Sequence, residues 1–410
     1  MKNIRTLSRV IVGFVFIFSG FVKGIDPLGS AYKFHDYFLA FGIPFMDTIS
    51  LGLSIFLATA EFIIGISLLM GTRMRLTSWL VLIFMSFFTI LTFIIALTNP
   101  VTDCGCFGDA LIITNWQTFI KNLILMTFVL FIFIQRDKFQ QFYPAYAEWA
   151  SLVVALAGFL ILISHSYQHL PPIDFRPYHI GTSIPENMKI PEGAPVDEYE
   201  TLLYYEKDGN VQEFTMDNYP WDDSTWSWVE TKSVLIKKGY EAPIHNFTIV
   251  SSDGFDITEE VLSASQPVIL LISHNLKEAN KKNLEKANAI ASYCKSGNCL
   301  FYGLTASPGE VIEVINNQIP LDFEFYFTDE VTLKTIVRSN PGLLALDNGI
   351  ITGKWHGNDI PDVSVFESSV HATGISKVIQ EKNTLVWYLF FSAVVLFLAL
   401  VKYIFKKAIV

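Results

Sequence analysis

Long apolar runs alternate with polar segments along the chain, and this pattern predicts a membrane protein. No charged residue occurs between Arg75 and Asp103, a stretch long enough for a helix to cross the hydrocarbon core of a bilayer. Similar runs occur at 7–25, 48–71, 116–135, 149–165 and 384–402. The pattern therefore predicts six transmembrane spans, of which the first four form one bundle.

The basic residues predict the orientation of these spans, because positively charged loops stay in the cytoplasm. They cluster before the first span, between the second and third, between the fourth and fifth, and at the C-terminus. All four clusters fall on the same side of the membrane. We therefore expect a multi-pass protein of the bacterial inner membrane, with a retained signal anchor, both termini cytoplasmic, and residues 166–383 periplasmic.

The polar segments show two other periodicities. Residues 200–216 alternate polar and apolar positions around Asp208-Gly209, which predicts a β-hairpin. From residue 242 onward, short apolar runs alternate with helical patterns; the run 267–273 predicts a buried strand and 275–293 a helix. We expect a membrane bundle at 1–140, a fifth transmembrane helix at 148–166, a β-rich subdomain at 167–240, an α/β domain at 241–365 and a sixth transmembrane helix at 384–404.

Charge and cysteine content limit the classes of molecule that the protein is expected to bind. The chain has 410 residues and a formal net charge of −10, and most of its acidic residues lie between 166 and 383. An acidic ectodomain argues against nucleic acid as a partner, which leaves the lipid bilayer and other proteins. The four cysteines all fall on the periplasmic side in this topology, where disulfides are stable.

Two of the cysteines, Cys104 and Cys106, are separated by one glycine in the loop after the third span. A disulfide between them closes a small ring, and strained disulfides exchange readily. Three roles are open: a redox-active disulfide facing a membrane carrier such as a quinone, a metal site, or an inert staple. We favour the redox role, with either cysteine as the attacking thiol, and expect no metal ion because the sequence nearby offers no further ligands. The charges of Asp103 and Asp109 are expected to raise both thiol pKa values.

Residues around this loop and inside the spans are candidates for supporting roles. Glu61 lies in the second span, where an acid is costly, and counting inward from the ends of the spans places it beside Arg9. We expect an Arg9–Glu61 ion pair; proton transfer or quinone contact by Glu61 are the alternatives. His35 is a candidate base for the cysteine pair. Trp116 and the aromatic residues of 32–41 are candidates for the border of a quinone site.

Several short motifs in the first 140 residues resemble a known family. They are Arg9–Gly13, Phe18-Ser19-Gly20, Lys23 and Asp26-Pro27 in the first span, Glu61–Gly65 with Leu68, Leu69 and Gly71 in the second, and Cys104–Asp109, Trp116 and Lys121-Asn122 beyond. The first two groups resemble the DoxX superfamily, and the third resembles its MauE branch. This resemblance implies a four-helix membrane bundle and a link to thiol redox chemistry in the periplasm.

The segment after residue 241 resembles membrane-anchored thioredoxin-like proteins. The similarity lies in Ala242-Pro243, the hairpin pattern of 247–254, and Asn340-Pro341-Gly342 before a closing hairpin. In this resemblance Pro341 is the cis-proline beside the thioredoxin active site. The Cys-x-x-Cys motif is missing, because its place is taken by Ser273-His274-Asn275. The resemblance therefore implies a groove bordered by His274, Asn275 and Pro341 that lacks the redox pair.

The remaining cysteines, Cys294 and Cys299, lie at the far end of the predicted helix 275–293. A local disulfide across this turn is expected in an oxidising compartment. Free thiols, or a second station in an electron relay, are the alternatives.

The sequence thus predicts a multi-pass α-helical bundle, DoxX/MauE-like with two further spans, and a thioredoxin-like α/β domain in the periplasm. The favoured function is that of a membrane thiol–disulfide oxidoreductase component. Cys104 and Cys106 would pass electrons between a periplasmic protein thiol and a membrane carrier, for which a quinone is the candidate cofactor. The alternative is a non-catalytic membrane scaffold whose thioredoxin-like groove binds a periplasmic client protein.

Overall fold

The structure is a computed structural model that describes residues 2–101, 103–139, 144–237 and 239–370, together with Leu385, Tyr388 and Ser392. Apart from those three positions, the predicted sixth span at 384–404 lies outside the described residues. The chain folds into two compact units. One comprises Met1–Thr182 and Thr248–Val410, and the other comprises Ser183–Phe247.

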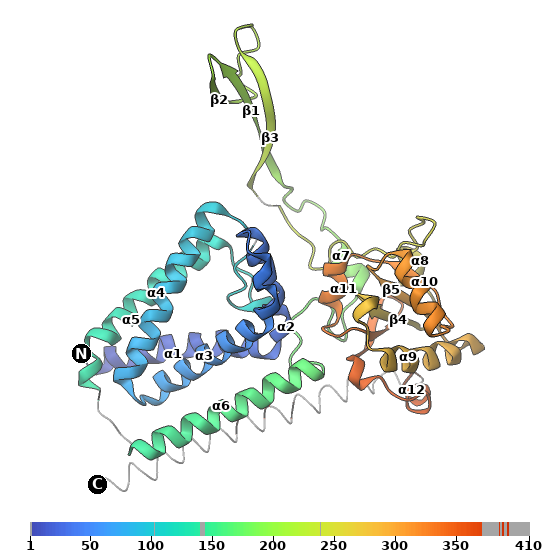
Figure 1. Ribbon diagram of the computed structural model, residues 1–410, viewed down its shortest axis with the longest axis horizontal. Coiled ribbons are helices and arrows are strands. Elements are labelled where there is room, and N and C mark those ends of the chain that lie inside the picture. The colour runs from blue at the N-terminus through green and yellow to red at the C-terminus, as the bar shows by residue number, and fades with distance from the viewer. Residues whose placement is uncertain are drawn as a thin grey trace. The chain divides into compact units, whose positions relative to one another are not determined.

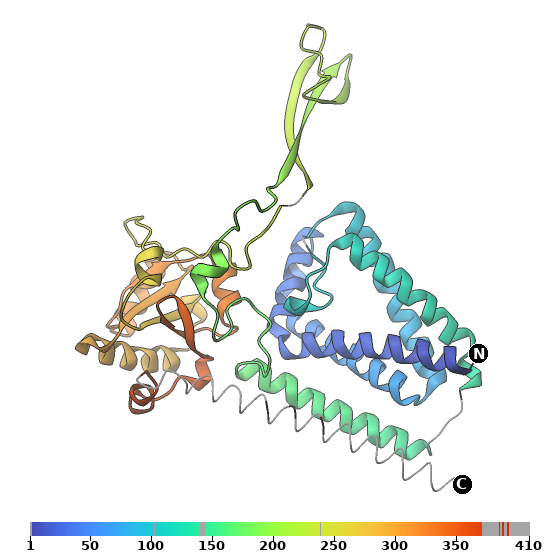
Figure 2. The same cartoon turned by 180° about the vertical axis from the view of Figure 1, so that it is seen from behind.

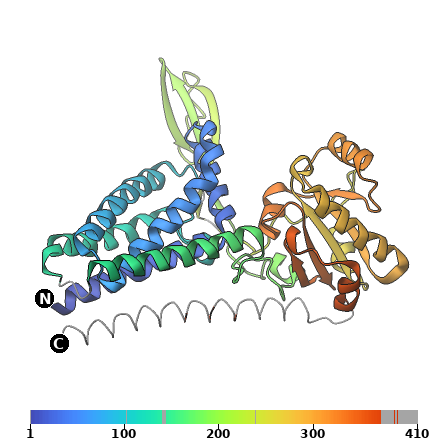
Figure 3. The same cartoon turned by 60° about the horizontal axis from the view of Figure 1, so that its bottom comes forward.

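Five described helices are long and apolar enough to cross a membrane. They are α1 (Lys2–Ile25), α3 (Ser50–Met70), α4 (Met74–Thr98), α5 (Asn115–Ile134) and α6 (Ala145–Gln168) (Figure 1). Each matches a predicted span, so the expected fold class, a multi-pass helical membrane protein with an α/β domain, is confirmed. The short connection from Gly71 to Arg73 joins α3 to α4, which diverge from it, and α4 and α5 lie side by side (Figures 1 and 3).

Helices α1 and α3 approach closely because small residues lie where they cross. A Cβ atom on Gly20 would lie 2.7 Å from the carbonyl oxygen of Ala58 and 2.7 Å from the backbone nitrogen of Phe62. A Cβ atom on Gly65 would lie 2.7 Å from the backbone nitrogen of Ile17. Such contacts between small residues replace the hydrophobic driving force that is missing between helices in lipid. These contacts fix the register of α3 against α1.

The segment between the first two spans forms α2 (Pro27–Ala40) and the 3₁₀ helix η1 (Pro44–Ile49). Asp26 caps α2 by accepting a hydrogen bond from the backbone N–H of Gly29 at 2.9 Å, and Pro27 takes the first helical position, where no N–H is needed. The Ser54 hydroxyl donates to the carbonyl oxygen of Pro27 at 2.8 Å. The start of α2 therefore lies beside the second turn of α3.

The α/β domain contains a five-stranded sheet of order β6-β5-β4-β7-β8. Strands β4 (Val268–Ser273), β5 (Leu300–Thr305) and β6 (Phe325–Phe327) are parallel. The hairpin of β7 (Gly342–Asp347) and β8 (Ile350–Trp355) adds to β4 in the antiparallel sense. Every residue of β4 is buried, as expected for a central strand.

The helices of this domain are α8 (Thr258–Leu262), α9 (Lys281–Tyr293), α10 (Gly309–Gln318), α11 (Glu330–Ile336) and α12 (Val363–Val370). The predicted start of the helix at residue 275 is wrong. Residues Leu276–Glu278 form the separate 3₁₀ helix η4, and α9 begins only after Asn280, whose side chain accepts from the backbone N–H groups of Lys282 and Asn283. The hairpin pattern at 247–254 gives single β-bridges, from Val250 to Asp256 and to Phe327.

The unit Ser183–Phe247 contains α7 (Ile184–Met188) and a three-stranded antiparallel sheet of order β2-β1-β3. Its strands are β1 (Glu198–Lys207), β2 (Asn210–Thr215) and β3 (Ser227–Lys237), which form a long, narrow ribbon (Figures 1 and 2). The predicted hairpin turn is present: Asp208 and Gly209 have φ values of 53° and 78°, as a type I′ turn requires.

The crossing of α1 and α3 leads to a test with a matched glycine. Gly20→Ala should destabilise the bundle by about 1–3 kcal/mol, because the added methyl group meets backbone atoms that cannot move aside. Gly52→Ala, in α3, is the control, because nothing lies within 4 Å of a Cβ atom there. Denaturant titration of the detergent-solubilised chain measures both. Equal effects of the two substitutions would contradict the close crossing.

Candidate functional site

The loop that joins α4 to α5 carries Cys104 and Cys106 as free thiols, and we call its residues 103–114 the cysteine loop. The two Sγ atoms lie 2.7 Å apart. Gly105 makes this approach possible, because its φ of 62° is in the left-handed region and its N–H donates to Oδ1 of Asp103 at 2.9 Å. The thiols are thus placed to form or break a disulfide with little movement of the backbone, since a disulfide bond is about 2.05 Å long.

Hydrogen bonds make the two thiols unequal. The two sulfur atoms share one hydrogen bond, and Sγ of Cys104 also lies 3.2 Å from Oγ1 of Thr118 and accepts the backbone N–H of Cys106 at 3.3 Å. The hydrogen bond with Cys106, with help from Thr118 and the charge of Lys121, lowers the pKa of Cys104 to about 6. The same hydrogen bond and burial raise the pKa of Cys106 well above its ordinary value. Cys104 is therefore the thiolate of the pair and the stronger nucleophile.

The expectation that Asp103 and Asp109 raise both thiol pKa values is wrong for Cys104. The carboxylate of Asp103 is neutralised by Lys33, whose Nζ lies 2.7 Å from Oδ2. The carboxylate of Asp109 lies 3.3 Å from the guanidinium of Arg338. The adjacent charges in the sequence are thus compensated by cations from distant parts of the chain, and local hydrogen bonds decide the ionisation of the thiols.

A buried ion pair lies directly beneath the cysteine loop. Nζ of Lys23 in α1 donates to both carboxylate oxygens of Glu61 in α3, at 2.8 and 3.0 Å, and the two side chains are 7% and 8% exposed. The same ammonium donates to the carbonyl oxygen of Cys106 at 2.8 Å and to the Ser19 hydroxyl at 2.7 Å. The hydroxyl of Ser19 also donates to the Cys106 carbonyl, at 2.8 Å. This ion pair therefore ties α1, α3 and the cysteine loop together.

The predicted partner of Glu61 is wrong: the partner is Lys23 and not Arg9. The prediction assumed that Thr48 and Lys23 lie at the same depth in the bundle. Residues 44–49 instead form η1, and Ser54 lies at the depth of Pro27. The acid consequently lies near the outer end of α1. Arg9 lies at the other end of α1, where its guanidinium contacts Gly71 and faces the Phe139 ring at 6.0 Å.

The cysteine loop closes a cavity of about 110 Å³ inside the bundle. Its walls are mainly apolar and come from α1 to α5; among them are Val15, Phe16, Phe34, Leu57, Phe84, Phe88 and Leu125. Both cysteines line it, together with Lys23, Glu61 and Lys121. An apolar cavity of about 150 Å³ takes a benzene ring, so this space is of the order of one six-membered ring. The lining offers apolar walls for the faces of such a ring and the ammonium of Lys121 at its edge.

Two predicted supporting residues lie outside this cavity. His35 pairs with Asp47, Nδ1 to Oδ1 at 3.0 Å, and lines a separate cavity of about 340 Å³ that Gly105 also lines. Trp116 is 51% exposed and packs edge-on against Phe119. The structure therefore places neither beside the sulfur atoms. Of the aromatic residues of 32–41, Phe34 and Tyr37 do line the cavity with the cysteines.

Arg338, which follows α11, is a residue of this region that sequence reasoning missed. Its Nε lies 3.1 Å from each carboxylate oxygen of Asp26, and its Nη2 lies 2.9 Å from Oδ2 of Asp26. Burial alone would raise the pKa of Asp26, but Arg338 outweighs it and the pKa is lowered. Because Nη2 also reaches Asp109, one guanidinium joins the helix cap and the cysteine loop. No local pattern marks this arginine, since its partners are far away in the sequence.

The structure brings together His274, Asn275 and Pro341 at the carboxyl end of β4. The Asn340–Pro341 peptide bond is cis, as expected. The side chain of Asn340 donates to the carbonyl oxygen of Asn275 at 2.6 Å and accepts from the Ser273 hydroxyl at 2.7 Å. Burial lowers the pKa of His274 to about 4, so its ring is neutral at pH 7. None of the described residues at this site carries a thiol.

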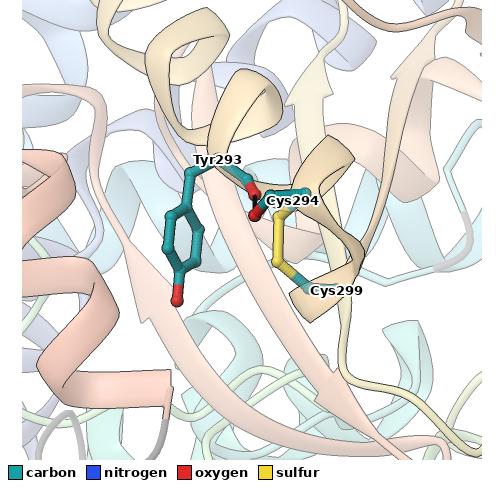
Figure 4. The surroundings of a disulfide bond; sticks show 4 residues. Tyr293, Cys294 and Cys299 are labelled. Atoms are coloured by element: carbon teal, nitrogen blue, oxygen red, sulfur yellow. Dashed lines mark hydrogen bonds between the residues drawn. A yellow bond between two sulfur atoms is a disulfide. The ribbon is translucent and has the colours of Figure 1, made fainter.

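Cys294 and Cys299 are joined in a disulfide, the pairing expected for this turn. The bond closes the short π-helical turn η5 (Cys294–Asn298) between α9 and β5, with the Tyr293 side chain beside it (Figure 4). Both cysteines are buried, at 3% and 4% exposure, within the core of the α/β domain. A sulfur buried in this way is poorly accessible to an attacking thiolate.

Comparisons with known proteins match two segments of the chain. Residues 1–135 match the family model described as methylamine utilisation protein MauE, so the MauE resemblance is confirmed for α1 to α5. Residues 199–238 match a model described as a domain of unknown function, DUF8463, which corresponds to the β1–β3 sheet. No curated protein matches the chain.

The unequal thiols predict a pH profile for alkylation. In the reduced protein, iodoacetamide should modify Cys104 with a midpoint near pH 6, because its thiolate predominates above its pKa of about 6. Cys106→Ala removes the hydrogen-bonded thiol and should move the midpoint upward, toward the ordinary value near 9. Peptide mass spectrometry after anaerobic pulses measures both. A wild-type midpoint near 9 would contradict the arrangement.

The buried ion pair predicts an asymmetry between single and double substitutions. Lys23→Met should destabilise the bundle by about 3–5 kcal/mol, because Glu61 is left buried without its cation. Lys23→Met combined with Glu61→Met should cost less, since no charge is then stranded. Denaturant titration in detergent gives both values. A double variant less stable than the single one would show that the pair is not coupled in this way.

Proposed function

We propose that the protein is a membrane thiol–disulfide redox protein in which Cys104 and Cys106 pass electron pairs between a protein dithiol and a quinone. The observation that carries the proposal is the pair of adjacent, unequal thiols lining an apolar cavity among membrane-spanning helices. The match to the MauE model over residues 1–135 supports a redox role for this segment.

The cysteine pair would work in two half-reactions. In the first, a partner thiolate attacks the Cys104–Cys106 disulfide, and its second thiol resolves the mixed disulfide, which leaves the partner oxidised and both cysteines reduced. In the second, Cys104 and Cys106 form their S–S bond, two electrons and the proton of Cys106 pass to the quinone, and the quinone takes up one further proton to become a quinol. The sum is one dithiol and one quinone converted to one disulfide and one quinol.

The unequal ionisation assigns the roles of the two sulfurs. Cys104 is the thiolate that reacts with an electrophile, because Thr118, the Cys106 thiol and a backbone N–H stabilise its charge. Cys106 keeps its proton until the disulfide closes. Lys23 and Ser19 hold the carbonyl oxygen of Cys106, which fixes the position of the loop during the exchange.

For the location, we propose the bacterial inner membrane with both termini in the cytoplasm. The distribution of basic residues supports this orientation and places the cysteine loop and residues 166–383 in the periplasm. A periplasmic protein would then supply the dithiol. The bounds 1–140, 148–166, 167–240, 241–365 and 384–404 remain our proposal for the domains.

We further propose that the α/β domain is thioredoxin-like and binds a client without exchanging disulfides. Its strand order, its cis-proline before β7 and the position of His274 after β4 support the likeness. Its two cysteines are buried in the Cys294–Cys299 disulfide, which favours a binding role. If the cysteine loop has no redox role, this domain would make the protein a non-catalytic scaffold.

The redox proposal predicts which thiols disappear when quinone is added. The reduced full-length chain in nanodiscs should lose two maleimide-reactive thiols on anaerobic addition of decylubiquinone and form one quinol per pair. Cys104→Ser and Cys106→Ser should each abolish quinol formation, because no disulfide can close. Acid quenching with mass-tagged maleimide, and quinol absorbance, are the measurements.

A separate variant tests the alternative that the protein is a non-catalytic scaffold. His274→Ala with Asn275→Ala alters the groove and leaves the cysteine loop intact, so the double variant should still reduce decylubiquinone. A loss of cellular function with this variant, while the two serine variants retain it, would replace the redox proposal with the scaffold.

A further inference from the structure

Two lysines reach the cavity behind the cysteine loop, and their ammonium groups are used differently. The ammonium of Lys23 has three protons and four acceptors within 3.0 Å: both oxygens of Glu61, the Ser19 hydroxyl and the carbonyl oxygen of Cys106. No proton of Lys23 is left for a ligand. This residue holds the protein together at that point.

Lys121 lines the same cavity from α5, and its Nζ lies 4.4 Å from the centre of the Phe107 ring. Among the described residues, no carboxylate lies within ion-pairing distance of Lys121 and no acceptor takes its protons in a hydrogen bond. A ring face attracts a cation but satisfies none of its three N–H donors fully. An ionisable residue inside a membrane span is costly, so a free one marks a functional position.

The surroundings of Lys121 hold it in place. The next residue, Asn122, is buried and donates to Oγ1 of Thr92 in α4 at 3.1 Å. One turn earlier, Thr118 contacts Sγ of Cys104 at 3.2 Å. The helix turn that carries Lys121 is thus fixed on α4 and beside the reacting sulfur. Lys121 and Cys104 line the same cavity, and the positive charge of Lys121 helps to lower the pKa of Cys104.

We propose that Lys121 is the residue that binds a carbonyl oxygen of the quinone in this cavity and gives it a proton as the Cys104–Cys106 disulfide forms. This inference rests on the redox function proposed above and assigns a catalytic residue to its second half-reaction. Cys104 and Lys121 both line the cavity, where Cys104 would supply electrons and the Lys121 ammonium would donate to a quinone oxygen.

The Cys104 thiolate and the Cys106 thiol form one S–S bond, and the S–H bond of Cys106 breaks. Two electrons pass to the quinone. One proton comes from Cys106 and the other from the ammonium of Lys121, which regains a proton from water afterwards. Lys23 takes no part in the transfer because Glu61 and the loop carbonyl occupy its protons.

The test uses the full-length chain in nanodiscs and the binding of decylubiquinone to protein whose cysteine pair is already oxidised, so that no turnover occurs. Lys121→Met keeps the length and apolar packing of the side chain but removes the donor. It should weaken binding about ten- to hundredfold, the effect of losing one charge-assisted hydrogen bond. Lys121→Arg should restore most of the affinity. Ile120→Met, on the exposed side of the same helix, is the matched control.

A second measurement separates binding from a structural role. Diamide should close the Cys104–Cys106 disulfide equally well in wild type and in Lys121→Met. Failure of the variant to close it would show that Lys121 supports the loop, which overturns the inference. Unchanged decylubiquinone affinity in Lys121→Met overturns it as well and leaves the redox function standing. If wild type itself does not bind decylubiquinone, the quinone half of the proposed function falls together with the role of Lys121.

Discussion

The buried ion pair between Lys23 and Glu61 is the interaction on which the arrangement of the bundle depends. Two charges removed from water must satisfy each other, and here the geometry leaves no donor of Lys23 unused. The Lys23 ammonium also donates a hydrogen bond to the carbonyl oxygen of Cys106, so the ion pair also determines where the cysteine loop lies. A buried charge that would otherwise be a cost to folding thus becomes the anchor of a loop with no regular secondary structure at its cysteines.

The close crossing of α1 and α3 makes this ion pair possible. Gly20 lies against the backbone between Ala58 and Phe62, so Lys23, about one turn further along, reaches Glu61 from the same face of α1. The cavity lies beside this crossing, because residues of both α1 and α3 line it together with residues of α4 and α5. Packing and charge pairing are thus consequences of one helix crossing.

Much of this arrangement could be predicted from the sequence, and the failures have definite physical causes. The five described spans, the Asp208-Gly209 turn and the central strand β4 follow from hydrophobic periodicity and turn chemistry, which are local properties. The partner of Glu61 could not be found by counting from span ends, because the residue that meets Lys23 is Glu61 and not Thr48, a difference of 13 residues (61 − 48). The ionisation of Cys104 was also out of reach, since besides the hydrogen bond with Cys106 it depends on Thr118 and Lys121 of α5 rather than on the adjacent aspartates.

The contrast between Lys23 and Lys121 shows how a structure distinguishes a charge that holds the fold together from a charge that is available to a ligand. Both are lysines inside apolar helices at the same cavity, and the sequence alone gives no reason to treat them differently. A lysine whose protons all have acceptors is held in one position and cannot release a proton without stranding a buried carboxylate. A lysine that faces only an aromatic ring can donate to a ligand and recover its proton, because no other bond has to break. The free donor beside a thiolate is therefore the group able to couple proton transfer to disulfide formation.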